Sequence, residues 1–227
     1  VYNWGYGIQR WLLPCRCRLC LAPDPDERGI CAGCLAELPR APIACPRCGR
    51  AVARPQLLCG ECQRRPPAFD RCVALFRYAA PLDALVLQLK FGQAVHLART
   101  FAVLFAERLR DEPRPDAVLP VPLHPARQRE RGFNQAIEIA RPLARQLGCA
   151  LDLDTCVRVR ATSPQTRLSA GARHRNLRGA FQLTRRPARH IALIDDVMTT
   201  GSTLNELAKA LRRGGAEQID VWVCART

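Results

Sequence analysis

The pattern of hydrophobic and polar positions divides the chain into two parts. From residue 72 onward, short apolar runs alternate with segments in which apolar residues recur at helical spacing. The pattern predicts strands at 72–78, 117–121, 151–159, 191–194 and 219–224, and helices at 82–90, 97–109, 134–147 and 202–211. Because strands and helices alternate, we expect an α/β domain with a mostly parallel sheet and helices on both faces.

The first 67 residues show neither pattern. Between Cys15 and Pro67 they contain few apolar residues, many Pro, Gly and Arg residues, and most of the cysteines. Pro66 and Pro67 follow the last cysteine of this segment and precede the first predicted strand. We therefore predict a small cysteine-rich module at residues 1–67 and the α/β domain at residues 68–227.

Eight of the 13 cysteines form four C-x-x-C pairs, each separated from the next by ten residues: Cys17/Cys20, Cys31/Cys34, Cys45/Cys48 and Cys59/Cys62. Two residues between thiolates is the spacing of a zinc knuckle, and four thiolates complete a closed tetrahedral site. The pattern therefore predicts a zinc-ribbon module with two structural Zn²⁺ ions. Because this segment offers little apolar core, we expect it to unfold without metal.

The cysteine pattern leaves some alternatives open. Redox-active pairs or free thiols are the other interpretations, but redox motifs do not usually occur in evenly spaced fours. Neighbouring pairs can share one ion, alternate pairs can interleave, and Cys15 can replace Cys17. Four other cysteines are interpreted as small buried residues: Cys72, Cys149, Cys156 and Cys224.

The run at 191–194 leads into the segment with the clearest chemistry. Asp195 and Asp196 follow it, and then a loop of small residues opens the last predicted helix: Thr199, Thr200, Gly201, Ser202 and Thr203. Unpaired amides and the helix dipole at a helix N-terminus both favour a phosphate, and glycine permits close approach of the backbone. The carboxylates can accept hydrogen bonds from vicinal hydroxyls or hold a metal ion. A polar turn with an N-cap is the simpler alternative, but it requires no such combination.

A second candidate segment carries arginines. Arg127, Arg129 and Arg131 precede Gly132 in what we expect to be a loop after the strand at 117–121. Arginine offers a fixed fork of donors that matches phosphate oxygens, so this loop suits a pyrophosphate. The alternative is a solvated, charged start of the next helix.

These motifs resemble those of known proteins. The segment 191–203 resembles the PRPP-binding signature of type I phosphoribosyltransferases (PRPP is phosphoribosyl pyrophosphate). With the string Arg131-Gly132-Phe133-Asn134-Gln135, the tract 162–181 and the four cysteine pairs, nearly the whole chain resembles the ComF/GntX family of competence-associated, phosphoribosyltransferase-like proteins. The resemblance implies that Asp195 and Asp196 contact the ribose hydroxyls, that the loop holds the 5′-phosphate, and that Mg²⁺ accompanies PRPP. It also implies a role for Lys90, which matches a Lys-aromatic step of the family.

The net charge of +15 is concentrated in one stretch. Residues 120–190 contain 14 arginines and four acidic residues, and so carry ten of the net positive charges. Such a field attracts PRPP and equally the backbone of single-stranded DNA. Two hypotheses result: a phosphoribosyltransferase with an unidentified acceptor, or a non-catalytic PRPP- or nucleotide-sensing module that binds nucleic acid. The resemblance favours a link to DNA uptake and to proteins of the competence machinery.

No apolar run approaches the ~20 residues of a membrane span, and the start of the chain has no signal-peptide pattern. We therefore expect a soluble cytoplasmic protein. The chain begins at Val1, so its natural start can lie upstream.

Overall fold

The structure is a computed structural model that describes residues 16–24, 29–91, 96–161 and 178–227. Cys15 and residues 162–177, which carry part of the family resemblance, lie outside the described residues. Among the described helices, none is both long and apolar enough to cross a membrane.

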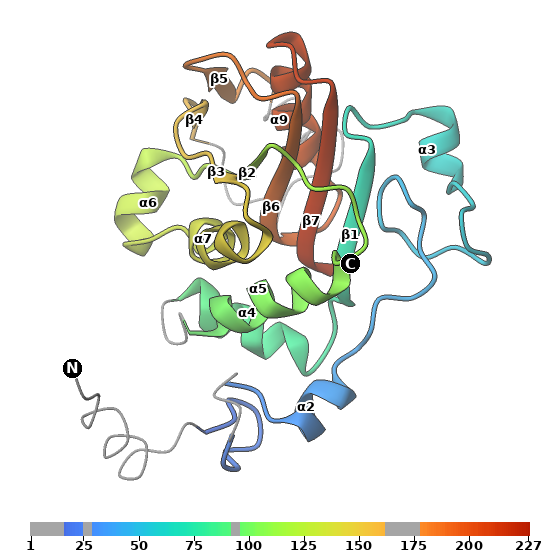
Figure 1. The fold of residues 1–227 in the computed structure, drawn as a ribbon, viewed down its shortest axis with the longest axis vertical. Coiled ribbons are helices and arrows are strands. Elements are labelled where there is room, and N and C mark those ends of the chain that lie inside the picture. Colours follow the sequence, from blue (N-terminus) through green and yellow to red (C-terminus); the bar gives the residue numbers. More distant parts are fainter. Residues whose placement is uncertain (1–15, 25–28, 92–95, 162–177) are drawn as a thin grey trace.

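The core of the molecule is a five-stranded sheet in which every neighbouring pair is parallel (Figure 1). Its order is β1-β7-β6-β2-β3. The strands are β1 (Arg71–Arg77), β2 (Ala117–Pro120), β3 (Ala150–Leu151), β6 (His190–Met198) and β7 (Gln218–Arg226). The central strands β6 and β7 are buried along most of their length, as expected for parallel strands that are covered on both faces. The predicted parallel α/β sheet is thus confirmed.

Helices cover both faces of this sheet, as predicted (Figure 1). On one face, three helices pack their apolar residues into one cluster: α4 (Leu82–Lys90), α5 (Leu97–Arg108) and α7 (Gln135–Leu147). On the other face, α9 (Ser202–Arg213) packs through Leu204, Leu207 and Leu211. β7 contributes to both clusters, because Trp222 faces the three helices and Val221 faces α9.

The prediction of one strand at 151–159 was wrong, because in the structure this segment contains two strands that belong to different sheets. β3 ends at Leu151, and β4 (Cys156–Arg158) pairs antiparallel with β5 (Phe181–Leu183), which was not predicted. The cause is Asp152, whose carboxylate accepts hydrogen bonds from the amides of Asp154 (3.2 Å) and Thr155 (3.0 Å). This turn takes the chain out of the first sheet.

The arginine segment is not the expected loop but the short helix α6 (Pro125–Arg131). Pro125 occupies the first turn, where the missing N–H costs nothing, and the His124 ring accepts a hydrogen bond from the amide of Ala126 (3.2 Å). Gly132 ends the helix in the left-handed region with φ 81°. Local capping residues thus turn the expected loop into a helix.

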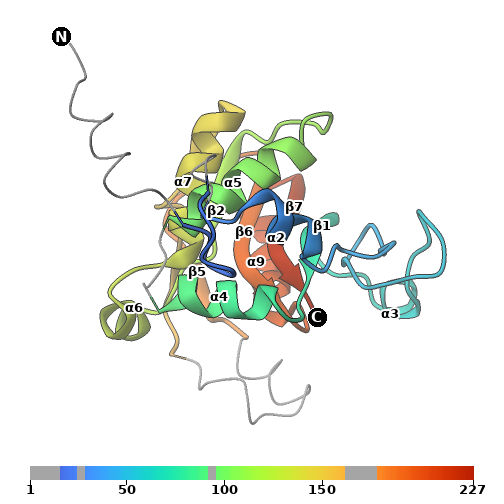
Figure 2. The ribbon, with the colours of Figure 1, turned by 90° about the horizontal axis from the view of Figure 1, so that it is seen from below.

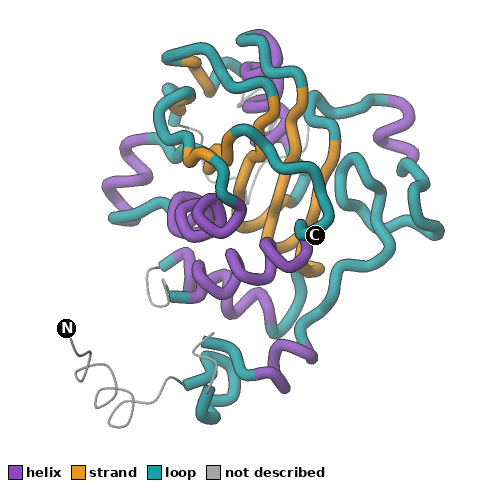
Figure 3. The backbone as a smooth tube through the Cα atoms, viewed as in Figure 1, coloured by secondary structure: helices purple, strands orange, loops and turns teal. Residues whose placement is uncertain are grey.

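The cysteine-rich part consists mostly of loops, with the short helices α2 (Ala32–Glu37) and α3 (Gly60–Arg64) (Figure 3). Its two halves lie in different places, with α2 beyond α4 and α3 outside the edge strand β1 (Figures 1 and 2). Cys17, Ile30 and Leu38 belong to the same apolar cluster as α4 and α5. The boundary at residue 67 therefore stays a prediction, because residues on both sides of it share one core.

Candidate functional site

The predicted phosphate loop lies between β6 and α9. Strand β6 does not end before the carboxylates but continues through both to Met198, and α9 begins at Ser202. Gly201 has φ 76°, and a Cβ at this position would lie 3.2 Å from the sulfur of Met198, so the turn favours glycine. Asp195 and all five predicted loop residues, Thr199 to Thr203, line one small hollow of about 70 Å³. The structure thus brings this part of the predicted site together.

The two aspartates have different surroundings. Asp196 is buried, and its Oδ2 lies 3.1 Å from Nζ of Lys90, the last residue of α4. Asp195 is half-buried, and its Oδ1 accepts a hydrogen bond from the amide of Asp196 at 2.9 Å. Desolvation and repulsion from Asp196 raise the pKa of the Asp195 carboxyl well above its ordinary value, although Lys90 opposes the shift. Lys90, far away in the sequence, therefore belongs to the same group as the aspartates.

One of the predicted arginines of α6, Arg131, is influenced by the charges of both aspartates. Burial and the charge of Arg127 lower the pKa of Arg131, whereas Asp196 and Asp195 oppose this shift. Arg131 therefore lies within electrostatic reach of both carboxylates, and it donates a hydrogen bond to Gln135 at 2.5 Å. Arg127 is exposed, and its charge lowers the pKa of Arg131.

Sequence reasoning missed Arg158 on β4. Burial lowers its pKa, the charge of Asp195 raises it, and that of Arg127 lowers it, so Arg158 lies within electrostatic reach of Asp195. Its guanidinium carbon lies 5.7 Å from the centre of the Phe181 ring, in reach of a cation–π interaction. Its local sequence does not distinguish it from other arginines, because only the pairing of β4 with β5 gives it this position.

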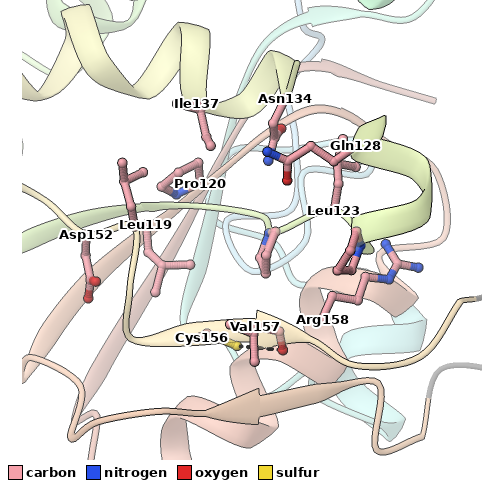
Figure 4. A pocket seen from close by; sticks show the side chains of 13 residues that line it. Leu119, Pro120, Leu123, Gln128, Asn134, Ile137, Asp152, Cys156, Val157 and Arg158 are labelled. Atoms are coloured by element: carbon pink, nitrogen blue, oxygen red, sulfur yellow. Dashed lines mark hydrogen bonds between the residues drawn. The ribbon is translucent and has the colours of Figure 1, made fainter. Parts of the chain in front are cut away.

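A larger pocket of about 260 Å³ lies beside Arg158, between the end of β2, α6, the start of α7 and β4 (Figure 4). Its walls are mostly apolar, and Figure 4 shows Asp152 at one end and Arg158 at the other. Asp152 binds Arg185 (2.8 Å), and Asn134 donates to the carbonyl of Val121 (3.0 Å). Arg158 thus lies on the wall of this pocket and within electrostatic reach of Asp195.

The eight predicted cysteines form two clusters of neighbouring pairs, which resolves the pairing: Cys17, Cys20, Cys31 and Cys34 in the first, and Cys45, Cys48, Cys59 and Cys62 in the second. Within each cluster all sulfurs lie within 4.8 Å of one another. The distance between the sulfurs of Cys20 and Cys31 is 3.7 Å, and that between Cys48 and Cys59 is 3.5 Å. Tetrahedral thiolates about 2.3 Å from Zn²⁺ lie roughly 3.8 Å apart, so both clusters fit a zinc ion.

The backbone favours a thiolate at one cysteine of each cluster, whereas a hydrogen bond from Cys20 raises the pKa of Cys34 and burial raises that of Cys62. Burial opposes the ionisation of Cys17, but hydrogen bonds from three backbone amides outweigh it and lower the pKa of this thiol to about 6. The same balance lowers the pKa of Cys45 to about 7. Of the other cysteines interpreted as buried, Cys72, Cys156 and Cys224 are buried, whereas Cys149 is half-buried.

Both parts of the chain match families of known proteins. Residues 8–63 match the double zinc ribbon domain family, and residues 134–226 match the phosphoribosyl transferase domain family. The DNA utilization protein YhgH of Salmonella typhi is 44% identical over 172 residues, which cover 72% of this chain and 75% of the relative. Competence protein F of Haemophilus influenzae is 40% identical over 173 residues, which cover 72% of this chain and 76% of the relative.

Part of the chain is also similar to solved structures. Glutamine PRPP amidotransferase from B. subtilis is 17% identical with a TM-score of 0.37, over 60% of this chain and 26% of that chain. Purine phosphoribosyltransferase from Pyrococcus horikoshii is 17% identical with a TM-score of 0.35, over 56% and 80% of the two chains. The family itself follows from the sequence relatives. The chain belongs to the ComF/YhgH family, in which an N-terminal double zinc ribbon precedes a phosphoribosyltransferase domain.

Proposed function

We propose that this protein binds PRPP with Mg²⁺ in the crevice between β6 and α9. One observation carries the proposal: the two aspartates and the loop from Thr199 to Thr203 lie together, and cationic side chains from other elements are within electrostatic reach of the aspartates. The backbone amides and hydroxyls at the start of α9 bind the 5′-phosphate, assisted by the helix dipole. Gly201 allows the phosphate to approach the main chain closely.

The carboxylates accept hydrogen bonds from the ribose hydroxyls. Asp196 is held by Lys90, whereas Asp195 is half-exposed to the crevice and remains able to bind a ligand. Carboxylate oxygens are also suitable ligands for Mg²⁺, which would neutralise part of the pyrophosphate charge. The raised pKa of Asp195 supports this role, because the site holds a carboxylate whose charge is not fully compensated without a ligand.

In the transfer reaction, an acceptor nitrogen forms a bond to the anomeric carbon of the ribose while the bond from that carbon to pyrophosphate breaks. Positive charge develops on the sugar and negative charge on the leaving group. Arg127 and Arg131 stabilise the leaving pyrophosphate, and Arg158 adds a third guanidinium to the same group. The reaction requires no protein nucleophile, so positioning and charge stabilisation are the work of the protein.

The acceptor belongs to DNA utilisation or uptake in this proposal, because relatives at 40–44% identity carry those names. The basic stretch 120–190 is the candidate surface for single-stranded DNA, and proteins of the competence machinery are candidate partners. The same charge supports the second candidate function, a module that binds PRPP or a nucleotide end together with nucleic acid and does not turn it over.

Calorimetric titration with PRPP and Mg²⁺, followed by assays of pyrophosphate release, tests the proposal. We expect binding, and release in the presence of an acceptor such as a nucleobase or single-stranded DNA. Binding without release for every acceptor supports the non-catalytic module. Absence of binding overturns both functions.

The double variant Asp195→Asn with Asp196→Asn tests the location of the site. We expect the affinity for PRPP to fall at least about 100-fold, because the ligand loses both carboxylates. Elemental analysis should still find two zinc ions per chain. Asp83→Asn, at the opposite end of α4 from Lys90, is the control and leaves binding unchanged. Retained affinity in the double variant contradicts the assignment.

A further inference from the structure

Arg226, the last residue of β7, joins the second cysteine cluster to the phosphate loop. In the pairing of β6 with β7, Arg226 lies opposite Met198, and its side chain is only 6% exposed. Its Nε donates to the carbonyl of Cys48 at 3.1 Å, and its Nη1 donates to the carbonyl of Met198 at 3.1 Å and to that of Thr199. One guanidinium therefore bridges a zinc knuckle and the start of the loop.

The knuckle is packed directly onto this arginine. Gly49, which follows Cys48, has φ +69°, and a Cβ there would lie 3.1 Å from the sulfur of Cys72 and 3.7 Å from Cγ of Arg226. The amide of Cys72 on β1 donates to the carbonyl of Pro46 at 2.9 Å. The loop between Cys45 and Cys48 is thus fixed against both β1 and β7. If the knuckle loses its shape, Arg226 loses one of its acceptors.

Charge reinforces this geometry. The guanidinium is positively charged and lies directly beside the second cluster, because its Nε binds the carbonyl of Cys48. Four thiolates with Zn²⁺ carry a formal charge of roughly −2, which stabilises a buried cation nearby. A loaded second cluster therefore holds Arg226 both by its backbone and by its charge.

We infer that Arg226 is a positioning residue, held by the second cluster, that keeps Met198 and Thr199 in the conformation that the loop needs to bind the 5′-phosphate. This inference rests on the proposed function of the loop. Binding free energies are reciprocal, so PRPP must in turn stabilise the second cluster against loss of zinc. The first cluster packs against α4 and α5 instead and serves as an internal control.

Zinc release from the full chain tests this coupling. The protein is challenged with a chromophoric chelator with and without PRPP and Mg²⁺, and released cysteines are alkylated and assigned by mass spectrometry. We expect PRPP to slow alkylation of the second cluster at least about fivefold and to leave that of the first unchanged. Equal slowing of both clusters, or slowing of neither, overturns the inference.

Variants of Arg226 provide the second measurement. Arg226→Lys and Arg226→Met should retain two zinc ions, bind PRPP at least about tenfold more weakly, and lose the PRPP-dependent protection of the second cluster. Arg212→Lys is the matched control, because Arg212 binds the carbonyl of Ala68 and the carboxylate of Asp70 rather than the loop. Its affinity and protection should equal those of the wild type.

The outcomes separate the two proposals. If the wild type binds PRPP and a folded Arg226 variant binds it equally well, only the positioning role fails. If the wild type does not bind PRPP, the proposed function fails and this inference fails with it. If neither Arg226 variant folds, the protection measured in the wild type alone decides.

Discussion

The two cysteine clusters have the same ligand spacing and similar sulfur geometry, yet they contact different parts of the molecule. In the first, Cys17 is fully buried in the main apolar cluster, and Arg18 donates to the ring of His96 beside α5 at 2.9 Å. In the second, three buried cysteines form a small cluster of their own, with Cys48 and Val52 packed against it. This second cluster contacts β1 and Arg226, and it is separate from the apolar cluster of α4 and α5.

The difference shows that a zinc motif determines the local backbone conformation. The elements packed against the motif determine which part of the molecule it stabilises. A metal site that shares the main core contributes to the stability of the whole domain. A metal site that has its own core can be lost with less damage to the fold, but it can still hold a loop in place through one buried side chain. We therefore expect the two clusters to affect different measurements.

Removing one ligand from each cluster tests this difference most strongly. Cys31 and Cys59 are matched, because each is the N-cap of a short helix, so Cys31→Ser and Cys59→Ser form the pair. Each variant should lose one zinc ion. We expect Cys31→Ser to lower Tm the more, by roughly 10 °C if the loss is about 3 kcal/mol. Cys59→Ser should instead lower the affinity for PRPP at least about tenfold, measured by calorimetry.

The reverse pattern would refute the different roles of the clusters. So would equal losses of PRPP affinity in Cys31→Ser and Cys59→Ser, provided that circular dichroism shows both variants to be folded at the temperature of the titration.

A smaller change, Gly49→Ala, distorts the second knuckle without removing a ligand. Its backbone is in the left-handed region and the new methyl group would press on Cys72, so we expect a cost of about 1–2 kcal/mol. Denaturant titration measures this cost, and the affinity for PRPP should fall with it. The control is Gly33→Ala in α2, where nothing lies within 4 Å of the new atom and alanine favours the helix. A Gly49→Ala protein as stable as the wild type would show that the knuckle is not tightly packed.

The smallest expected effect concerns the charge of Asp195 rather than the shape of the loop. The pKa of Asp195 is higher in the folded than in the unfolded protein, so its ionised carboxylate destabilises the folded state at pH 8. At a pH near the pKa of the unfolded chain, much of this destabilisation disappears because the carboxyl group is protonated. Asp195→Asn should therefore raise the Tm of the free protein at pH 8, by roughly 2–4 °C for each 1 kcal/mol, and much less at pH 4. Thermal melts at both values measure this, and the release of zinc should not change. If Asp195→Asn had a lower Tm than the wild type at pH 8, the charge of Asp195 would not be destabilising.

Much of the fold could be predicted because buried parallel strands and amphipathic helices have distinct patterns. The failures have local physical causes. The carboxylate of Asp152 captures two amides and ends a strand that the apolar pattern continues. His124 and Pro125 cap a helix in the arginine segment, which we expected to be a loop. β5 has three residues, too few to show a period.

The candidate site also contains residues that could be predicted from the sequence and residues that could not. Asp195 to Thr203 could be predicted because one contiguous segment carries the whole motif. Arg158 and Arg226 could not, because their positions depend on the pairing of β4 with β5 and on the register of β6 with β7. Equal spacing of the cysteine pairs likewise left their partners open until the fold placed neighbouring pairs together.

Calorimetric titration of the full chain with PRPP and Mg²⁺ is the most direct test of the central claim, that the loop between β6 and α9 binds PRPP. The account predicts one PRPP per chain, weaker binding without Mg²⁺, and an affinity at least about 100-fold lower in the Asp195→Asn, Asp196→Asn double variant that still holds two zinc ions. No heat of binding in the wild type, or the same affinity in the double variant, would contradict it.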